Sequence, residues 1–337
     1  MQMGRSAMRR VSVAEITEET GLSRATVDRV LNRRGKVHPR TRAAVEETLR
    51  RLSQPEAPAP VAPVADIALR VGKGMILQMR QAWAQSGARG LFEDMHLASE
   101  EAVLRRVEAL CRDISRPLIL TAKNSDRLTG VLRQARDRGK RIVAMVSDLA
   151  PSARDAFVGI DDRAAGRTAA FLIGRMLGDR PTTVGVVLGN IAFRCHEDRE
   201  IGFRTGLREH FPKVVLAAEA QGEDSAALTR EAVLRMLQSN PALGAVYNVG
   251  GGNVGLVEAL RQSGRDRDIL VVGHEANAVT TPLLLDGGLD FALSSDPRPL
   301  LDAALRCATA ESLVPDRSLV DFSVYTRFNL PGFSGAA

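Results

Sequence analysis

A short segment near the amino end, residues 22–32, combines arginines with the spacing of a helix. Val27, Val30 and Leu31 recur at helical spacing and give this helix an apolar side. The opposite side carries polar or small residues: Arg24, Ala25, Asp28, Arg29, Asn32 and Arg33. A guanidinium group can donate two hydrogen bonds to the acceptor edge of guanine. The segment therefore predicts a helix that lies in a groove of DNA.

Two further helices must hold this segment in place. Ser12 and Glu15 form a capping box, which predicts a helix start near Val13. Gly21 ends that helix in a tight turn, Ser23 caps the arginine-bearing helix, and Pro39 opens a third. The inner faces of the first and third helices are expected to be Val13, Ile16, Thr20, Val45, Leu49 and Leu52. Such an arrangement is a helix-turn-helix unit, whose second helix enters the major groove.

The charge of the chain is concentrated on this helical segment. The 337 residues carry a net charge of +6. Residues 1–54 hold 12 Lys and Arg against 6 Asp and Glu, whereas the other 283 residues hold 34 of each. Such asymmetry is expected where neutralisation of phosphates drives affinity. It disfavours the alternative of an ordinary solvated helical bundle with arginines on its outside.

Length and composition bound the rest of the chain. A length of 337 residues exceeds the usual size of one hydrophobic core and predicts two to three domains. Cys111, Cys195 and Cys307 are widely spaced and form no Cys-x-x-Cys pair, which favours a reducing compartment and no zinc site. The sequence shows neither a signal-peptide core nor a long apolar run, so we expect a soluble cytoplasmic protein without a membrane partner.

A proline-rich linker is expected at residues 55–65, because four prolines exclude a regular helix or a paired strand. After it, short apolar runs alternate with helical patterns. The expected strands are Ile67–Val71, Leu91–His96, Leu118–Thr121, Ile142–Val146, Phe157–Ile160, Val184–Leu188, Val214–Ala218, Ala245–Asn248, Ile269–Gly273 and Phe291–Ser294. The expected helices include residues 101–112, 126–138, 164–177, 199–210, 226–238, 254–262 and 299–310.

This alternation predicts parallel sheets that are covered by helices on both faces. Ten strands suit two doubly wound lobes better than one, because cores tend to split at this size. Ligands of such sheets bind beyond the carboxyl ends of the strands, so we expect a binding cleft between the lobes.

Several motifs together identify a family. In the helical segment they are Gly21-Leu22-Ser23, Thr26-Val27, Arg29-Val30-Leu31-Asn32 and Thr41-Arg42; in the rest they are Val158-Gly159-Ile160-Asp161-Asp162, Arg199-Glu200-Ile201-Gly202-Phe203, Tyr247-Asn248 and Val271-Val272-Gly273-His274-Glu275. With these motifs the chain resembles the lactose repressor family of bacterial transcription regulators, which join a helix-turn-helix headpiece to a core like the periplasmic sugar-binding proteins.

The resemblance implies an all-α helix-turn-helix headpiece and an α/β two-lobed core of the type I periplasmic-binding-protein kind, with doubly wound parallel sheets. The headpiece would occupy residues 1–54 and the core residues 66–337. The N-lobe would take about 66–162 plus 294–320, and the C-lobe about 163–293 plus 321–337.

The resemblance also implies how the headpiece reads DNA. Arg24, Ala25 and Arg29 would contact bases, Arg24 by pairing with guanine and Ala25 by touching a thymine methyl group. Ser23, Thr26 and Asn32 match positions that hold phosphates and so set the register; for Thr26 a packing role is the alternative. The partner would be a pseudo-palindromic double-stranded operator bound by a homodimer. No leucine heptad ends the chain, so we do not expect a tetramer.

One departure from the family concerns the segment after the third helix. The family has an Asn-Tyr-x-Pro-Asn motif and a short hinge helix there, whose leucine wedges into the minor groove. This chain has Ser53-Gln54-Pro55-Glu56-Ala57-Pro58-Ala59-Pro60, without leucine. We therefore expect the coupling between the core and the headpiece to depend on how far apart the dimer holds its two tethered headpieces.

For the cleft, the resemblance implies a ligand set of Asp161, Arg199, Asn248 and Glu275. These groups suit a sugar or polyol, because carboxylates accept hydroxyl protons, arginine donates in a fork and asparagine does both. The alternative for Arg199 is a solvated helix start. Of the adjacent acids, Asp161 is expected to face the ligand and Asp162 to cap the helix that follows.

At two positions in this region, the chain differs from the residues that are common in the family. Glu275 and His274 replace an aspartate and a tyrosine common there, so the family's effector does not carry over. Few aromatic residues are available for a stacked sugar face, and Phe193 and Trp83 are the best candidates.

Three functions remain in competition. We favour a DNA-binding transcription regulator, with repression as the family's commoner use, in which a ligand shifts operator affinity by a change of populations. Gly250-Gly251-Gly252-Asn253-Val254-Gly255 matches a dinucleotide fingerprint, with Glu275 twenty residues on, and makes an NAD-binding oxidoreductase the second hypothesis. The third is a free-standing solute-binding protein. The favoured function needs no cofactor and no catalytic residue.

Overall fold

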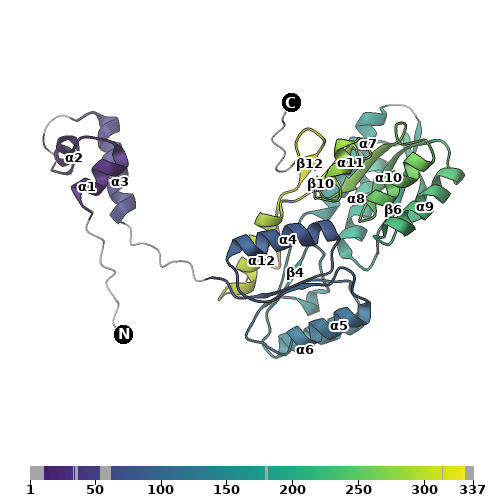
Figure 1. Cartoon of the computed structure of the whole chain (residues 1–337), viewed down its shortest axis with the longest axis horizontal. Helices are drawn as coiled ribbons and strands as arrows, with labels where there is room; N and C mark the ends of the chain where they lie inside the picture. Colours follow the sequence, from purple (N-terminus) through teal and green to yellow (C-terminus); the bar gives the residue numbers. More distant parts are fainter. Residues whose placement is uncertain are drawn as a thin grey trace. The chain divides into compact units, whose positions relative to one another are not determined.

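The computed structural model describes residues 11–32, 34, 37–53, 62–178, 181–312 and 314–330. The chain divides into two compact units, Met1–Ala62 and Pro63–Ala337 (Figure 1). Most of the expected linker, residues 54–61, lies outside the described residues, as do Arg33 and the end of the chain from residue 331.

The first unit contains three helices, α1 (Val13–Thr20), α2 (Arg24–Leu31) and α3 (Pro39–Ser53). The predicted capping box begins α1, and Gly21 ends it with a left-handed φ of 65°. Ser23 caps α2 by accepting a hydrogen bond from the backbone of Thr26. All three helices contribute to one small core, which is built from Ile16, Val27, Val30 and Val45 with Val13, Leu22, Leu31, Leu49 and Leu52 around them.

The second unit begins with a lobe built on a six-stranded parallel sheet, which we call the N-lobe. Its strands, in spatial order, are β11 (Arg317–Leu319), β5 (Ala156–Gly159), β4 (Ile142–Met145), β3 (Leu118–Thr121), β1 (Asp66–Leu69) and β2 (Phe92–Asp94). Helices α4 (Lys73–Ser86) and α12 (Pro297–Thr309) cover one face, and α5 (Glu100–Leu110) and α6 (Asp126–Asp137) cover the other (Figure 1). A short 3-10 helix, η1 (Pro151–Ala153), joins β4 to β5.

The C-lobe repeats this plan. Its strands, in spatial order, are β12 (Ser323–Tyr325), β10 (Phe291–Ser294), β9 (Leu270–His274), β8 (Leu243–Asn248), β6 (Thr182–Leu188) and β7 (Val214–Gln221). One face is covered by α7 (Asp162–Leu177) and α8 (Arg194–His210), and the other by α9 (Ala226–Ser239), α10 (Asn253–Gln262) and α11 (Thr281–Leu285). Each lobe therefore buries its apolar side chains in two layers, one on each face of its sheet.

All ten expected strands are present; two have the predicted ends, and the ends of the others differ by no more than three residues. Sequence reasoning missed two short strands, β11 and β12, and two helices, α4 and α11. It also expected parallel sheets throughout, whereas β12 runs antiparallel to β10. Both missed strands are only three residues long and largely exposed, so they carry no apolar run.

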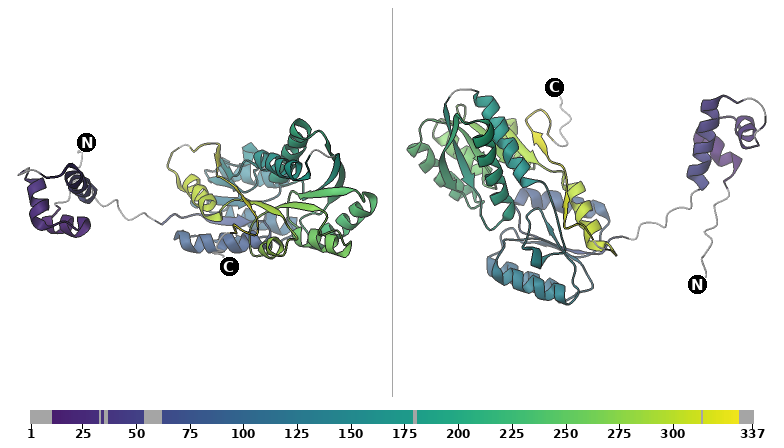
Figure 2. Two further views of the ribbon diagram at one scale, coloured as in Figure 1. Left: turned by 90° about the horizontal axis from the view of Figure 1, so that it is seen from above. Right: turned by 180° about the vertical axis from the view of Figure 1, so that it is seen from behind.

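The chain passes between the lobes at three places in the described residues: 160–161, 295–296 and 320–322. Figure 2 shows the two lobes and these connections from two further directions. Two of the crossings directly follow the carboxyl ends of β5 and β10. The space between the lobes is therefore bordered by strand ends and by the connections themselves.

Candidate functional site

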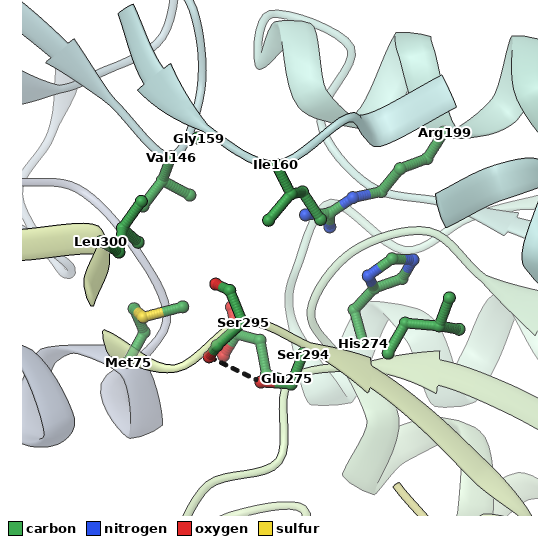
Figure 3. A pocket seen from close by; sticks show the side chains of 11 residues that line it. Met75, Val146, Gly159, Ile160, Arg199, His274, Glu275, Ser294, Ser295 and Leu300 are labelled. Carbon is green, nitrogen blue, oxygen red and sulfur yellow. Dashed lines mark hydrogen bonds between the residues drawn. The ribbon is translucent and has the colours of Figure 1, made fainter. Parts of the chain in front are cut away.

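A small pocket lies between the two lobes at these strand ends (Figure 3). It is lined by Met75, Val146, Gly159, Ile160, Arg199, His274, Glu275, Leu293, Ser294, Ser295 and Leu300. In Figure 3 the side chains of Met75, Val146 and Leu300 lie on one side, and Arg199 and His274 lie on the other. The pocket thus has an apolar N-lobe wall, whereas the C-lobe wall combines the charged Arg199 and Glu275 with His274 and the apolar Leu293.

Close packing of α7 against α8 positions the arginine of this pocket. A Cβ atom on Gly166 would lie 2.0 Å from the carbonyl oxygen of Arg199, and one on Gly202 would lie 2.2 Å from that of Arg163. Only glycine lets the two backbones approach so closely. The contact places Arg199, in the second turn of α8, directly beside the first turn of α7.

Arg199 is held by two hydrogen bonds. Its Nε donates to Oδ1 of Asp162 at 2.8 Å, and its Nη1 donates to the backbone oxygen of Val249 at 2.9 Å. The side chains of both charged partners are at most one tenth exposed. Burial raises the pKa of Asp162 to about 6, and the charge of Arg199 opposes that shift. A buried ion pair of this kind fixes the direction in which the guanidinium points.

A neutral histidine lies beside this ion pair. Nε2 of His274 is 2.8 Å from the hydroxyl of Tyr247, and both side chains are buried. Burial holds the pKa of His274 well below its usual range, and the positive charge of Arg199 lowers it further. His274 therefore stays uncharged, and its ring can accept the hydrogen bond of the tyrosine hydroxyl.

Glu275 enters the pocket from an unusual backbone conformation, with a φ of 68°. Its Oε2 accepts a hydrogen bond from Nδ2 of Asn277 at 2.7 Å. Burial raises the pKa of Glu275, and the charge of Arg199 opposes that shift. Positive φ is rare for residues other than glycine and occurs often at binding sites.

Contacts between the lobes close the pocket. Nε2 of Gln78 in α4 donates to the backbone oxygen of Ala276 at 2.9 Å. On the other side, the backbone N–H of Asn124 donates to the oxygen of Ala192 at 2.9 Å. The remaining cavity has a volume of about 30 Å³, whereas pockets for small molecules usually measure about 300–1,000 Å³. A ligand can enter only if the lobes separate or side chains rotate.

Of the four ligand residues and two aromatic candidates predicted from the sequence, Arg199 and Glu275 line this pocket. Asp162 was expected to cap α7, but Asp161 is the exposed residue that caps it through the backbone of Ala164, and Asp162 is the buried acid; neither lines the pocket. The carboxylate of Asp161 completes the helix start because the exposed turn there leaves the N–H groups without a partner.

The other predicted ligand residues lie outside the pocket lining. Asn248 is fully buried and donates to Gly251 and Asn253, so its amide shapes the turn after β8. Phe193 stands at the start of α8, where its ring contacts His196 edge-on. Trp83 packs edge-on against Phe92 in the N-lobe. The structure brings no aromatic ring into the lining.

Sequence reasoning also placed the start of α8 five residues too late, at Arg199 instead of Arg194. The buried face of this helix includes Cys195, Arg199, Gly202 and Gly206, which carry little apolar signal. Most of the pocket residues that were missed lie at the carboxyl end of a strand or directly after it, as Gly159 ends β5 and Ser295 follows β10. The carboxyl end of each predicted strand, with the residue after it, is the signal that could have found them.

The glycine-rich turn at residues 250–255 packs tightly against the C-lobe. A Cβ atom on Gly255 would lie 1.8 Å from the backbone oxygen of Ala226, and one on Gly252 would lie 2.2 Å from the hydroxyl of Thr229. The N–H of Gly251 donates to Asp224 at 2.8 Å. Glycine is therefore needed at positions 252 and 255 because α10 packs closely against α9, and side chains there would overlap α9.

In the first unit, α2 presents a polar surface. Arg24, Ala25, Asp28 and Arg29 are exposed, and Val27 and Val30 are buried, as the spacing predicts. The hydroxyl of Thr26 lies 2.9 Å from that of Ser23. Asn32 is also exposed, but its amide donates to the side chain of Asp28 at 2.9 Å. Arg24 and Arg29 are thus placed on a surface where they can contact a partner.

Two further findings concern the described part of the chain. No group of three or more His, Cys, Asp or Glu side chains there could hold a metal ion. No helix among these residues is long and apolar enough to cross a membrane.

The fold and the cleft between its lobes define a protein of the periplasmic-binding type. Residues 117–312 match the periplasmic binding protein domain family. The chain belongs to this family, which is typically not enzymatic. No curated protein matches the sequence.

Several solved structures share the fold of the second unit. GanP, a glucose-galactose binding protein from Geobacillus stearothermophilus, has a TM-score of 0.71 at 16% identity, over 80% of this chain and 99% of that one. A transporter solute-binding protein from Burkholderia graminis, in complex with D-arabinose, has a TM-score of 0.70 at 18% identity, over 81% and 98%. A solute-binding protein from Bacillus halodurans with bound myo-inositol has a TM-score of 0.67 at 15% identity, over 81% and 97%.

Proposed function

We propose that the second unit binds a small sugar or polyol between its lobes. The observation that carries this proposal is the pocket at the strand ends, where Arg199, Glu275 and Ser295 meet. Arginine, carboxylate and hydroxyl groups together can donate to and accept from the hydroxyl groups of one small ligand. Proteins that share the fold were solved with D-arabinose and with myo-inositol, which supports the choice of ligand class.

We further propose that the first unit binds DNA, so that the whole chain is a ligand-responsive transcription regulator. The excess positive charge of residues 1–54 and the exposed arginines of α2 support this proposal. Lobe closure around the ligand would alter a homodimer, and through it the affinity for an operator. Ser23, Thr26 and Asn32 would position α2 on phosphates, and Arg24, Ala25 and Arg29 would contact bases.

A free-standing solute-binding protein is the second candidate, because the similar solved structures named above are binding proteins of that kind. The two candidates share the cleft and differ in the first unit. A solute-binding protein needs no DNA affinity, whereas the regulator does.

Calorimetric titration of the full chain with D-arabinose, D-galactose and myo-inositol tests the ligand class. We expect at least one of the three to bind and expect NAD not to bind. Binding of NAD alone would make the glycine-rich turn the ligand site and overturn the proposal.

Repeated selection of DNA sequences on the full chain tests the regulator. We expect enrichment of a pseudo-palindromic site, and we expect Arg24→Ala to lose discrimination at one base pair of each half-site by about 1–3 kcal/mol. Arg230→Ala, which changes an exposed arginine of α9, is the matched control. Failure to enrich any sequence would favour the free-standing solute-binding protein.

A further inference from the structure

The two walls of the cleft differ in what they offer a ligand. From the N-lobe, Met75, Val146 and Leu300 line the pocket with aliphatic or thioether side chains. Ile160, at the first crossing between the lobes, adds a further apolar side chain to the lining; in Figure 3 it is drawn between these residues and Arg199. These side chains offer a ligand hydroxyl group at most the weak acceptor of the Met75 thioether, so this wall suits a hydrocarbon part of a ligand.

The polar wall has unused hydrogen-bonding positions. Arg199 donates through Nε and Nη1 to its protein partners, so Nη2 has none in the described residues. Glu275 accepts a hydrogen bond from Asn277 through Oε2, so Oε1 has no hydrogen-bond partner in the described residues. One donor and one acceptor on two C-lobe residues that line the pocket therefore remain unpaired in the described part of the chain. Adjacent hydroxyl groups of a ligand match this pair.

Val146, in the apolar wall, has an energetically unfavourable backbone conformation. Val146 has a φ of 67°, and its N–H is held by the backbone oxygen of Val158 at 2.9 Å. A left-handed backbone is a genuine outlier for a β-branched residue, and glycine or asparagine would adopt it more readily. Such strain is concentrated at ligand sites. Here the strained backbone places an isopropyl group in the pocket.

From this contrast we infer that the ligand is a deoxy sugar or deoxy polyol, bound with its hydroxyl groups on Arg199 and Glu275 and its methyl group on Met75, Val146 and Leu300. This inference rests on the proposed sugar-binding function. A ligand with a hydroxyl group in place of the methyl group would bury that hydroxyl against the apolar wall without a partner. We therefore expect the deoxy form to bind about 10- to 100-fold more tightly than its hydroxylated counterpart.

Calorimetric titration of the full chain with matched pairs tests this inference. The pairs are L-rhamnose with L-mannose, L-fucose with L-galactose, and 6-deoxy-D-glucose with D-glucose; each differs only by one hydroxyl group. We expect the deoxy member to bind about tenfold or more tightly in at least one pair.

The variant Val146→Thr keeps the branched shape and adds a hydroxyl group to the apolar wall. It should reduce the preference for the deoxy member by about tenfold. Val215→Thr makes the same change on the exposed edge strand β7, where Val215 is 55% exposed, and should leave the preference unchanged.

The outcomes separate the two proposals. Equal or tighter binding of the hydroxylated member in every pair that binds would overturn the deoxy-ligand inference and leave sugar binding in place. Binding of D-arabinose, D-galactose or myo-inositol without binding of any paired sugar would do the same. If none of these compounds binds, both proposals fall.

Discussion

Arginines have opposite surroundings in the two units of this protein. Arg24 and Arg29 are exposed on α2, in a small unit with a large excess of positive charge. Arg199 is 8% exposed and is fixed by hydrogen bonds to Asp162 and Val249. Exposed arginines attract a partner through long-range charge that salt screens, whereas a buried one presents a fixed donor at short range. The contrast teaches that one residue type stands in two electrostatic settings here, a solvated surface and a buried ion pair.

The largest expected effect follows from removing the buried arginine. Arg199→Met leaves Asp162 buried without its partner, so the free energy of unfolding should fall by about 3–5 kcal/mol. Urea denaturation measures this loss. Adding Asp162→Asn to the same chain should restore part of it, because the uncompensated carboxyl is then gone. If Arg199→Met were neutral, the ion pair would not hold the cleft wall.

The second effect depends on pH. The pKa of Asp162 is raised to about 6 by burial, above its unfolded value of about 3.9. For a raised carboxyl pKa, the stabilising contribution is fully present below the unfolded value and is lost as the pH rises through 6. Asp162→Asn lacks this dependence. The free energy of unfolding of Asp162→Asn minus that of the parent chain should therefore rise by about 3 kcal/mol between pH 3.5 and pH 7. Denaturation of both chains at each pH measures this difference.

The third effect tests the packing that positions Arg199. Gly166→Ala would place a Cβ atom 2.0 Å from the oxygen of Arg199 and force α7 from α8. We expect a loss of about 1–3 kcal/mol in stability and weaker binding of any ligand found for the cleft. Gly130→Ala, in α6 where the added Cβ meets nothing within 4 Å, is the control and should stabilise the chain by about 0.4–1 kcal/mol. Equal behaviour of the two variants would contradict this account.

The smallest effect on stability is expected for the exposed arginine. Arg24→Ala should change the free energy of unfolding by no more than about 0.5 kcal/mol, since Arg24 lies on the surface. If the regulator proposal is right, operator affinity should nevertheless fall, and discrimination at the base pair that Arg24 contacts should relax. A large loss of stability in this variant would mean that Arg24 is structural, which would erase the contrast with Arg199.

The elements that sequence reasoning predicted best are those with a local signal. The capping box at Ser12 and Glu15 placed α1, and the spacing of Val27 and Val30 identified the buried side of α2. The ten apolar runs became ten of the twelve strands of the two sheets, all but β11 and β12. The short strands β11 and β12 had no such signal, because they are defined by the neighbours with which they pair.

The candidate site was only partly predictable. Arg199 and Glu275 stood in motifs that resemble those of a known family, and both line the pocket. Asp161 and Asp162 could not be distinguished by position alone, because a rotation of about 100° along the helix separates a capping acid from a buried one. Val146 was predicted as the last residue of a strand and Ser295 as the first residue after one, and position alone did not indicate that both face the same cavity.

The sequence by itself determined the local elements, the concentration of positive charge in residues 1–54 and the two-lobed α/β plan. Periodicity, caps and charge are properties of residues near one another in the chain, so they can be read without coordinates. Only the tertiary structure decided which acid faces Arg199, that Asn248 shapes a turn, and that one wall of the cleft is apolar. These facts depend on contacts between strand ends far apart in sequence, and three crossings between the lobes bring those ends together.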